Sequence, residues 1–357
     1  MPTESATPTA EATRLPGLEV VEAKPELKPE HWIERAPQKR LMLFAGRSNP
    51  DLAGAIAERL DVELGAVELK TFANGETYCR YLESIRGADV FLIQTGCEPV
   101  DRNLIELLIM IDAAKLASAK RITAVIPWFP YSRQDKKTLP REPISAKLVA
   151  EMLQTAGADR ILTMDLHSGQ IQGFFRIPVD HMRALPLFVQ YFRDRGLFGD
   201  RVVSVSPDAG RAKVAGKFGD MLETPGFAIM NKTRPEHDVA DVRTVIGDVH
   251  GKVAIMSDDM IITGGTLIEG AKALREAGAT DVYACATHGL FPGDALERLG
   301  ESELKEIIVT DTVPVNPLRA PEKLHVLPVS GILAETIHNV FSDESVSAIF
   351  AGENQLF

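Results

Sequence analysis

The chain has few cysteines, no long apolar run and no excess of basic residues. Cys79, Cys97 and Cys285 are scattered without the spacing of a metal site, which argues against a disulfide framework and suits a reducing cytoplasm. No apolar run reaches the roughly 18 residues that span a bilayer, so we expect a cytoplasmic protein with no membrane partner. The 39 Lys and Arg face 50 Asp and Glu, and this net charge of -11 argues against nucleic acid as a partner.

The length of 357 residues indicates two domains of ordinary size. Residues 1–38 are rich in Pro, Glu, Ala and Thr and show little periodicity, so we expect a disordered N-terminal arm there. The glutamates of this arm distinguish it from an organelle transit peptide, which is poor in acidic residues.

From Lys39 onward, short apolar runs alternate with amphipathic stretches. In the first half, the pattern predicts strands at Arg40–Ala45, Asp89–Gln94, Arg121–Trp128 and Arg160–Asp165, and helices at Asp51–Leu60, Asn103–Leu116 and Ile144–Thr155. In the second half, it predicts strands at Arg201–Val205, Phe227–Met230, Val253–Met256, Val282–Thr287 and Ile307–Thr310, and helices at Gly210–Leu222, Leu267–Ala277 and Ile332–Val340. Such alternation is typical of an α/β protein with a mainly parallel sheet, flanked by helices, in each half.

The two halves divide near residue 183. We therefore expect similar domains at 39–183 and 184–325, and a C-terminal segment, 326–357, that packs back on the first domain. Polar clusters follow four of the predicted strands: Arg133-Gln134-Asp135, Asp165-Leu166-His167, Pro207-Asp208 and Asp258-Asp259. In parallel sheets ligands bind beyond the carboxyl ends of the strands, so we expect these clusters to form a site.

The stretch from Lys252 to Thr266 carries the most specific pattern. An apolar strand runs into Asp258 and Asp259, where vicinal sugar hydroxyls can be held, and adjacent acids after a buried strand are costly without a partner. Residues 263–266 then offer N–H groups and hydroxyls to an anion, next to a helix expected to start at Leu267. The alternative interpretation is an ordinary polar turn between a strand and a helix.

This stretch resembles the ribose-phosphate-binding signature of type I phosphoribosyltransferases and ribose-phosphate pyrophosphokinases. Further motifs occur in the order found in the second family, in its ATP-dependent, hexameric and mainly bacterial class, and the resemblance covers nearly all of 39–357. These motifs are Phe72–Glu76, Tyr131–Lys137, Arg141–Ile144, Thr155–Asp159, Met164–His167, Gln170–Phe175, Pro178–His181 and Val205–Gly210.

The resemblance implies two phosphoribosyltransferase-like domains, the first on the ATP side and the second on the ribose 5-phosphate side. It implies transfer of the pyrophosphoryl group of ATP to the 1-hydroxyl of ribose 5-phosphate, which gives phosphoribosyl pyrophosphate and AMP for nucleotide biosynthesis. It also implies Mg²⁺ as cofactor, a homohexamer, and inorganic phosphate or ADP as effectors.

The resemblance also assigns residues to roles. It implies ATP binding by Phe72, Asn74, Gly75 and Glu76 from a neighbouring subunit, and by Arg133 and Gln134. It implies ribose 5-phosphate binding by Arg234, Asp258, Asp259, Ile262, Thr263, Gly264, Gly265 and Thr266. It places His167 and Asp208 at the magnesium site, and Lys232 and Arg234 on a mobile catalytic loop.

Several of these residues have simpler interpretations. Mg²⁺ prefers oxygen ligands, so only the resemblance makes His167 a metal ligand. Asp208 fits the N-cap of a helix. Arg133 belongs to a charge run of the kind that is usually solvated, and Lys232 and Arg234 fit ordinary loop charges.

Three positions depart from the family pattern, and one of them, Asp311 in place of the usual asparagine, lies away from the expected chemistry. Ile262 stands where the family has an aspartate, so a hydrogen-bond acceptor and a negative charge are missing beside the expected phosphate loop. Pro328 stands where the family often has a serine at its regulatory site, and proline offers neither a hydroxyl nor an N–H. Ser84 and Arg86, which resemble other parts of that site, are retained.

Two other functions remain open from the sequence. One is a non-catalytic paralogue that assembles with an active enzyme and regulates it, which Ile262 allows but the retained Lys232 and His167 oppose. The other is a salvage phosphoribosyltransferase, which needs only one such domain and no adenine loop. Release of AMP from ATP that depends on ribose 5-phosphate would distinguish these functions.

Overall fold

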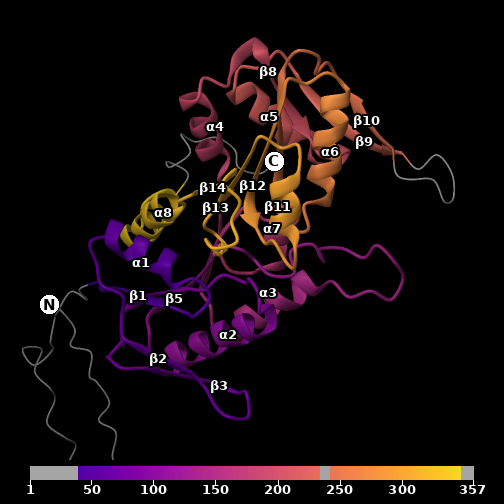
Figure 1. Cartoon of the computed structure of the whole chain (residues 1–357). Coiled ribbons are helices and arrows are strands. Elements are labelled where there is room, and N and C mark those ends of the chain that lie inside the picture. Colours follow the sequence, from indigo (N-terminus) through magenta and orange to yellow (C-terminus); the bar gives the residue numbers. More distant parts are fainter. Residues whose placement is uncertain (1–38, 234–241, 347–357) are drawn as a thin grey trace, which may run out of the picture. The chain divides into compact units, whose positions relative to one another are not determined.

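The computed structural model describes residues 39–233 and 242–346, which belong to a compact unit that begins at Lys39 (Figure 1). The predicted N-terminal arm and the C-terminal segment from residue 347 lie outside the described residues. Among the described residues, no helix is both long and apolar enough to cross a membrane.

The first sheet has five parallel strands in the order β1-β4-β5-β6-β7. They are β1 Leu41–Ala45, β4 Asp89–Ile93, β5 Arg121–Ile126, β6 Arg160–Met164 and β7 Val179–Met182. The helices of this part are α1 Pro50–Arg59, α2 Val100–Leu116, α3 Ser145–Ala156 and the 3-10 helix Gly169–Phe174. An antiparallel hairpin that the sequence pattern did not predict consists of β2 Val67–Thr71 and β3 Thr77–Tyr81.

The second sheet has seven strands in the order β10-β9-β8-β11-β12-β13-β14, all parallel except the antiparallel pair β9 and β10. They are β8 Val202–Ser206, β9 Phe227–Thr233, β10 Val242–Ile246, β11 Val253–Ile261, β12 Asp281–Gly289, β13 Glu306–Thr310 and β14 Leu324–Leu327. The helices are α4 Leu185–Asp194, α5 Ala212–Met221, α6 Gly265–Glu276, α7 Ala295–Glu301, α8 Ser330–Ser342 and the 3-10 helices Gly199–Arg201 and Ala209–Arg211. The predicted α/β class with helix-flanked parallel sheets is confirmed.

Helices cover both faces of the first sheet, and strand β4 shows why. All five of its residues are buried, and side chains alternate between the two faces of a strand. Phe91 and Ile93 join a core cluster with α1 and α8, whereas Val90 and Leu92 join another with α2 and α3. A strand buried on both faces reads as one apolar run, which is why the sequence pattern predicted it.

The second sheet shares one of these clusters. Ile255 of β11 lies in the same cluster as Phe91, together with Phe192 of α4 and Phe218 of α5. Its neighbour Ala254 faces the opposite side, where α6 and α7 complete a separate cluster. One continuous apolar core therefore links a face of each sheet.

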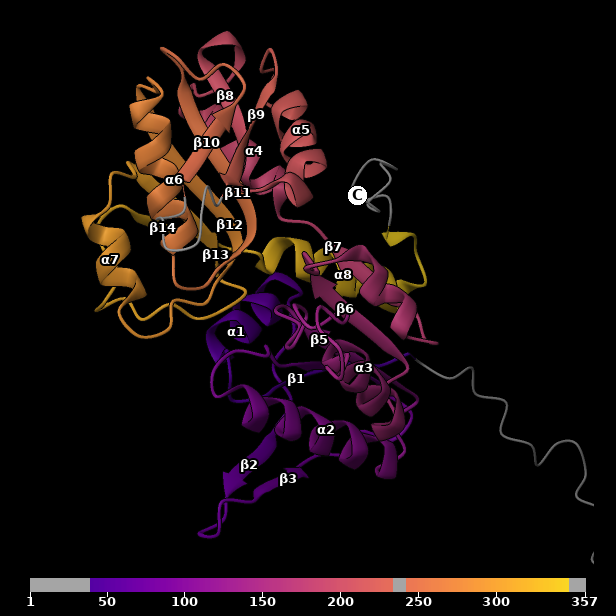
Figure 2. The same ribbon diagram turned by 90° about the vertical axis from the view of Figure 1, so that its right-hand side faces the viewer.

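Helix α8 follows the second sheet in the chain but packs beside α1 of the first (Figure 2). Arg59 Nε donates to Ser330 Oγ across 2.8 Å at this contact. The expected boundary between residues 325 and 326 falls inside β14. The domain boundaries proposed from the sequence stay a prediction.

Candidate active site

A pocket of about 290 Å³ gathers most of the residues predicted to bind ligands. Its walls come from the segments that follow β5, β6 and β8, from β11, and from the loop before α6 with the first turn of that helix. The predicted site residues among its walls are Arg133, His167, Asp208, Asp258, Asp259, Ile262, Thr263, Gly264, Gly265 and Thr266. The pocket thus combines residues that follow strands of both sheets.

The two carboxylates lie within strand β11 and not beyond its end, where the sequence pattern placed them. Strand β11 continues to Ile261 because its last residues pair with β12, for example Asp258 with Ala286. The side chains of Asp258 and Asp259 are 22% and 3% exposed, as expected when neighbours on a strand face opposite ways. The prediction ended the strand too early because the run of apolar residues stops before these acids.

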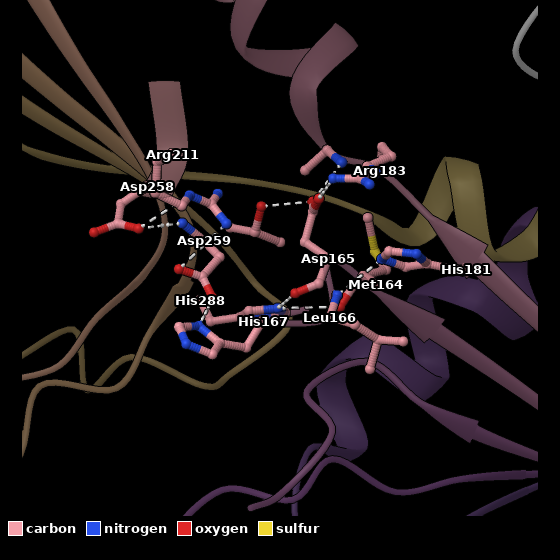
Figure 3. A network of polar contacts seen from close by, with 12 residues as sticks. Met164, Asp165, Leu166, His167, His181, Arg183, Arg211, Asp258, Asp259 and His288 are labelled. Carbon is pink, nitrogen blue, oxygen red and sulfur yellow. Dashed lines mark hydrogen bonds and ion pairs between the residues drawn. The ribbon is translucent and has the colours of Figure 1, made fainter. Parts of the chain in front are cut away.

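Arg211, for which the sequence predicted no role, is the cationic partner of both acids. Its Nε lies 3.5 Å from Asp258 Oδ1, and its Nη1 lies 3.7 Å from Asp259 Oδ1 (Figure 3). The buried Nε has no hydrogen-bond partner among the described residues, so its contact with Asp258 is an ion pair and not a hydrogen bond. The available signal was a basic residue three positions after Asp208, at the start of the predicted helix.

The surroundings shift the pKa values of Asp258 and Asp259 in opposite directions. Burial, and then the contact with Asp259, raises the pKa of Asp258 well above its usual value. Burial also opposes ionisation of Asp259, but the hydrogen bond from His167 and the charge of Arg211 outweigh it and lower the pKa of Asp259. At neutral pH the negative charge of the pair is therefore favoured on Asp259.

His167 joins the first sheet to this acid pair. Its Nδ1 lies 2.7 Å from Asp259 Oδ2 (Figure 3), and an ionised carboxylate can only accept, so Nδ1 carries the proton. With that tautomer, Nε2 is the ring nitrogen that can offer a lone pair to a ligand. An imidazole whose other nitrogen donates to a carboxylate is the usual arrangement of a metal-binding histidine.

Asp208 has the capping role that the sequence offered as an alternative. Its Oδ1 accepts a hydrogen bond from the backbone N–H of Arg211 at 3.1 Å, at the start of the helical turn after β8. The side chain is also exposed to the pocket. Because a carboxylate has about four lone-pair sites, one cap bond leaves capacity for a ligand.

The donor set is too small for a metal held by protein alone, and of its two members Asp208 offers the oxygen that Mg²⁺ prefers whereas His167 offers a nitrogen. Within residues 39–233 and 242–346, no group of three or more His, Cys, Asp or Glu has metal-binding geometry. His167 and Asp208 supply two ligands at most, whereas a structural zinc site needs four. Mg²⁺ usually takes few protein ligands and completes its shell with water and substrate phosphates.

The loop before α6 is shaped for an anion. Gly264 has a φ of +72°, and a β-carbon there would lie 2.7 Å from Cγ of Leu299, so only glycine fits. Helix α6 begins at Gly265, two residues earlier than predicted. Its free N–H groups, together with the hydroxyls of Thr263 and Thr266, suit a phosphate.

Ile262 separates the pocket from a small apolar cluster. It lines the pocket and is half-buried. It also packs against the buried side chains of Cys97, Trp128, Met260 and Val313. A carboxylate at this position would lose its water on the side of the cluster. Ile262 instead packs against the cluster and offers no polar contact to a ligand.

The predicted adenine-side loop lies at the tip of the β2–β3 hairpin and is not among the pocket walls. Phe72 is 45% exposed, and its ring meets Tyr78 edge to face at 5.6 Å. Gly75 has a φ of +94°, and Asn74 Oδ1 accepts from the N–H of Glu76 at 3.3 Å. The tip is thus a defined turn with an exposed aromatic ring.

The remaining ATP and catalytic residues are more dispersed. Gln134 is exposed, accepts a hydrogen bond from Ser145 Oγ at 2.6 Å and, unlike Arg133, does not line the pocket. Lys232 belongs to strand β9. Arg234 lies outside the described residues.

The residues predicted to regulate the protein lie on exposed turns. Ser84 and Arg86 are in the turn between β3 and β4, where their carbonyl oxygens accept from the Arg40 guanidinium. Pro328 is exposed between β14 and α8. A regulatory role for these three residues stays a prediction.

Comparison with known proteins gives consistent matches over the same residues. Residues 41–157 match the N-terminal domain of ribose phosphate pyrophosphokinase, and residues 226–351 match the phosphoribosyl synthetase-associated domain. A ribose-phosphate pyrophosphokinase of Fusobacterium nucleatum is 48% identical over 86% of this chain and 97% of the relative. The ribose-phosphate pyrophosphokinase of Caldanaerobacter subterraneus is 51% identical over 87% of this chain and 98% of the relative. The crystal structure of phosphoribosylpyrophosphate synthetase from Mycobacterium smegmatis shares 50% identity, covers 85% of this chain and 99% of that one, and gives a TM-score of 0.81.

Proposed function

Because this chain belongs to the ribose-phosphate pyrophosphokinase family and makes phosphoribosyl pyrophosphate from ribose 5-phosphate and ATP, we propose that the pocket around Asp258 and Asp259 is its ribose 5-phosphate site. The observation that carries this proposal is the placement of the acid pair beside the anion loop in one pocket. The carboxylates can accept hydrogen bonds from vicinal sugar hydroxyls, while residues 263–266 hold the 5-phosphate.

His167 and Asp208 are the proposed protein ligands of Mg²⁺. The donor count described above supports this assignment, because two ligands leave room for phosphate oxygens and water. Bound there, Mg²⁺ would neutralise charge on the transferred phosphates. Asp259 holds the His167 ring by its Nδ1–H, so the chain itself sets the direction of the Nε2 lone pair.

ATP is proposed to bind near Arg133, which lines the same pocket. The adenine side would be completed by Phe72, Asn74, Gly75 and Glu76 from a neighbouring subunit, because in its own chain this hairpin tip does not line the pocket. This proposal requires self-association, and we expect a homohexamer. Light scattering at assay concentration tests it, because a fully active monomer would exclude a shared site.

Lys232 and Arg234 are the proposed catalytic residues, with Arg234 also near ribose 5-phosphate. The 1-hydroxyl of the sugar attacks the β-phosphorus of ATP, and AMP leaves. Phosphoryl-type transfer depends mainly on positioning and charge neutralisation, and two cations two positions apart in the chain suit that task. Gln134 has a supporting role in ATP binding, through the turn that carries Arg133.

We further propose that the protein works in the cytoplasm, and that phosphate and ADP act through a site that includes Ser84 and Arg86. The central experiment measures AMP release from ATP and Mg²⁺ with and without ribose 5-phosphate. We expect release only with the sugar phosphate, and its loss in Asp259→Ala and His167→Ala. Unchanged activity in both folded variants would show that this pocket is not the active site.

A further inference from the structure

The segment that leads into His167 has an uncommon backbone conformation. Asp165, two residues earlier, has a φ of +34°, and few residues other than glycine adopt positive φ. Such conformations persist only where the surrounding structure holds them in place. The contacts of residues 164–166 therefore decide where the His167 ring lies.

His181 holds this segment from the first sheet. Its Nε2 accepts a hydrogen bond from the N–H of Leu166 at 2.8 Å. Burial, and then the charge of Arg183, lowers the pKa of His181 to about 4, so the ring is neutral at pH 7 and able to accept. The contact stays within the sheet, because His181 lies on β7, which pairs with β6.

Two neighbouring residues of β12 hold the same segment from the second sheet, and Figure 3 labels one of them, His288. Thr287 Oγ1 donates to Asp165 Oδ2 across 2.7 Å. His288 Nε2 lies 3.1 Å from the carbonyl oxygen of Met164 and 3.3 Å from that of Asp165, and because carbonyls only accept, this nitrogen carries the proton. The other ring nitrogen, Nδ1, is 2.9 Å from the hydroxyl of Thr312.

These contacts are buried and specific. Thr287 and His288 are 2% and 0% exposed, and burial lowers the pKa of His288, in keeping with a neutral ring that donates from Nε2. A buried strand position is usually occupied by an apolar side chain. Filling the core therefore does not explain why Thr287 and His288 are polar.

We propose that Thr287 and His288 are positioning residues: they hold the Asp165–His167 segment, and so set the His167 imidazole against Asp259. This inference rests on the proposed role of His167 in binding Mg²⁺ with ATP. The register supports it, because Met260, the neighbour of Asp259 on β11, pairs with His288 on β12. One pair of adjacent strands thus carries both the acid that contacts His167 and the donors that hold the segment before it.

Thr287→Val is the most direct test, because valine keeps the shape of threonine and removes only the hydroxyl donor, while the backbone N–H of Ala184 still donates to Asp165 Oδ2 at 2.8 Å. Thr287→Ser restores the hydroxyl and is the matched rescue variant. Thr163→Val is the control, because Thr163 is fully buried on β6 and its hydroxyl has no partner among the described residues. His288→Leu and His288→Gln form a second pair, in which only glutamine can donate to the carbonyl oxygens.

Two measurements separate positioning from general stability. Calorimetry of a non-hydrolysable ATP analogue with Mg²⁺ reports binding without turnover, and steady-state kinetics report kcat and the KM of ribose 5-phosphate. For Thr287→Val and His288→Leu we expect binding of the magnesium–nucleotide and kcat each to fall about tenfold or more, the usual effect of losing an outer contact to a metal ligand. Serine and glutamine should recover most of the loss, and Thr163→Val should match the parent.

The inference is wrong if folded Thr287→Val and His288→Leu both bind magnesium–nucleotide and turn over like the parent. It is equally wrong if Thr287→Ser and His288→Gln fail to restore nucleotide binding and kcat, because the shape of the side chain and not its hydrogen bond would then account for the loss. If one of the apolar variants does not fold, the other and the rescue variants decide. A His167→Ala variant with parental binding would instead overturn the proposed metal site, so the two failures are distinguishable.

Discussion

The imidazole of His167 donates from Nδ1 to Asp259 Oδ2 across 2.7 Å, and this bond joins the segment after β6 to strand β11. It therefore connects the proposed magnesium side of the pocket with the proposed sugar side. The same bond lowers the pKa of Asp259, which keeps this acid ionised beside Arg211. One hydrogen bond thus orients the histidine and sets the charge of the carboxylate.

The Asp259→Asn variant should lose much of its activity while it stays folded. Asparagine keeps the shape but not the charge, so His167 and Arg211 lose their ionised partner. We expect kcat/KM for ribose 5-phosphate to fall by about 10- to 100-fold, as for other losses of a carboxylate behind a ligand histidine. Asp220→Asn, at an exposed position of α5, is the matched control. Parental kinetics in Asp259→Asn would contradict the assignment.

Lys232→Ala should lower turnover by about 10² or more and spare the fold, because a preorganised charge contact to the transferred phosphates is removed. Lys272→Ala is the control, because Lys272 is exposed on α6 beyond its first turn and pairs with Glu276. Stopped assays for AMP, with circular dichroism of both variants, measure the effect. Near-normal turnover in folded Lys232→Ala would exclude a catalytic role.

Ile262→Asp should change turnover more than the affinity for ribose 5-phosphate, because the acid pair and residues 263–266 still supply the main contacts. Loss of packing against Trp128 and Met260 should also lower the free energy of unfolding by about 1 kcal/mol. Ile262→Asn should share the loss of stability but not the change in turnover. If the parent binds both substrates without forming product and only Ile262→Asp is active, the chain is a regulatory paralogue.

Pro328 should weaken inhibition by ADP and activation by phosphate at the regulatory site. A serine there would add one hydroxyl donor to an anion, a contact worth about 1.5 kcal/mol. Pro328→Ser should therefore lower the ADP concentration for half-maximal inhibition roughly tenfold, since about 1.4 kcal/mol corresponds to that factor. The assay must use saturating ATP, because ADP also competes at the ATP site. Strong non-competitive inhibition of the parent would refute this prediction.

Stability should fall with pH between about 6.5 and 4, in part through His181. Its folded-state pKa of about 4 lies below the ordinary value of 6.5, so in this window the unfolded chain binds a proton that the folded chain does not. Stability is present above the window and is lost as pH falls, by at most about 3.5 kcal/mol at about 1.4 kcal/mol per pKa unit.

The variant His181→Gln tests this, because glutamine does not titrate and its carbonyl can still accept from Leu166. Urea unfolding at pH 7 and pH 5 should show a smaller difference in the variant than in the parent. Asp165, Arg183 and His288 face the ring and remain in both proteins. Since burial also lowers the pKa of His288, some pH dependence should persist. An unchanged difference would show that His181 does not contribute.

Sequence alone determined the class of the fold and most of the pocket. Strands such as β4 are buried on both faces, so their apolar runs are continuous and easily recognised. Gly264 and the neighbouring pair Asp258 and Asp259 are local features, and the order of residues alone predicts their chemistry. The hairpin β2–β3 escaped prediction because its strands are short and only partly buried, although Val67 and Leu69 alternate with polar residues and pack on the core.

Tertiary structure alone decided the partners of those residues. Arg211 contacts Asp258 and Asp259 across about fifty positions of the chain, and no local pattern encodes such a pairing. The strand β11 runs through both acids because β12 supplies its backbone hydrogen bonds there, a contact that composition cannot reveal. His288 illustrates the same limit. In the sequence it is one histidine after an apolar run. Only the packing of the two sheets places its ring against the backbone segment that leads to His167.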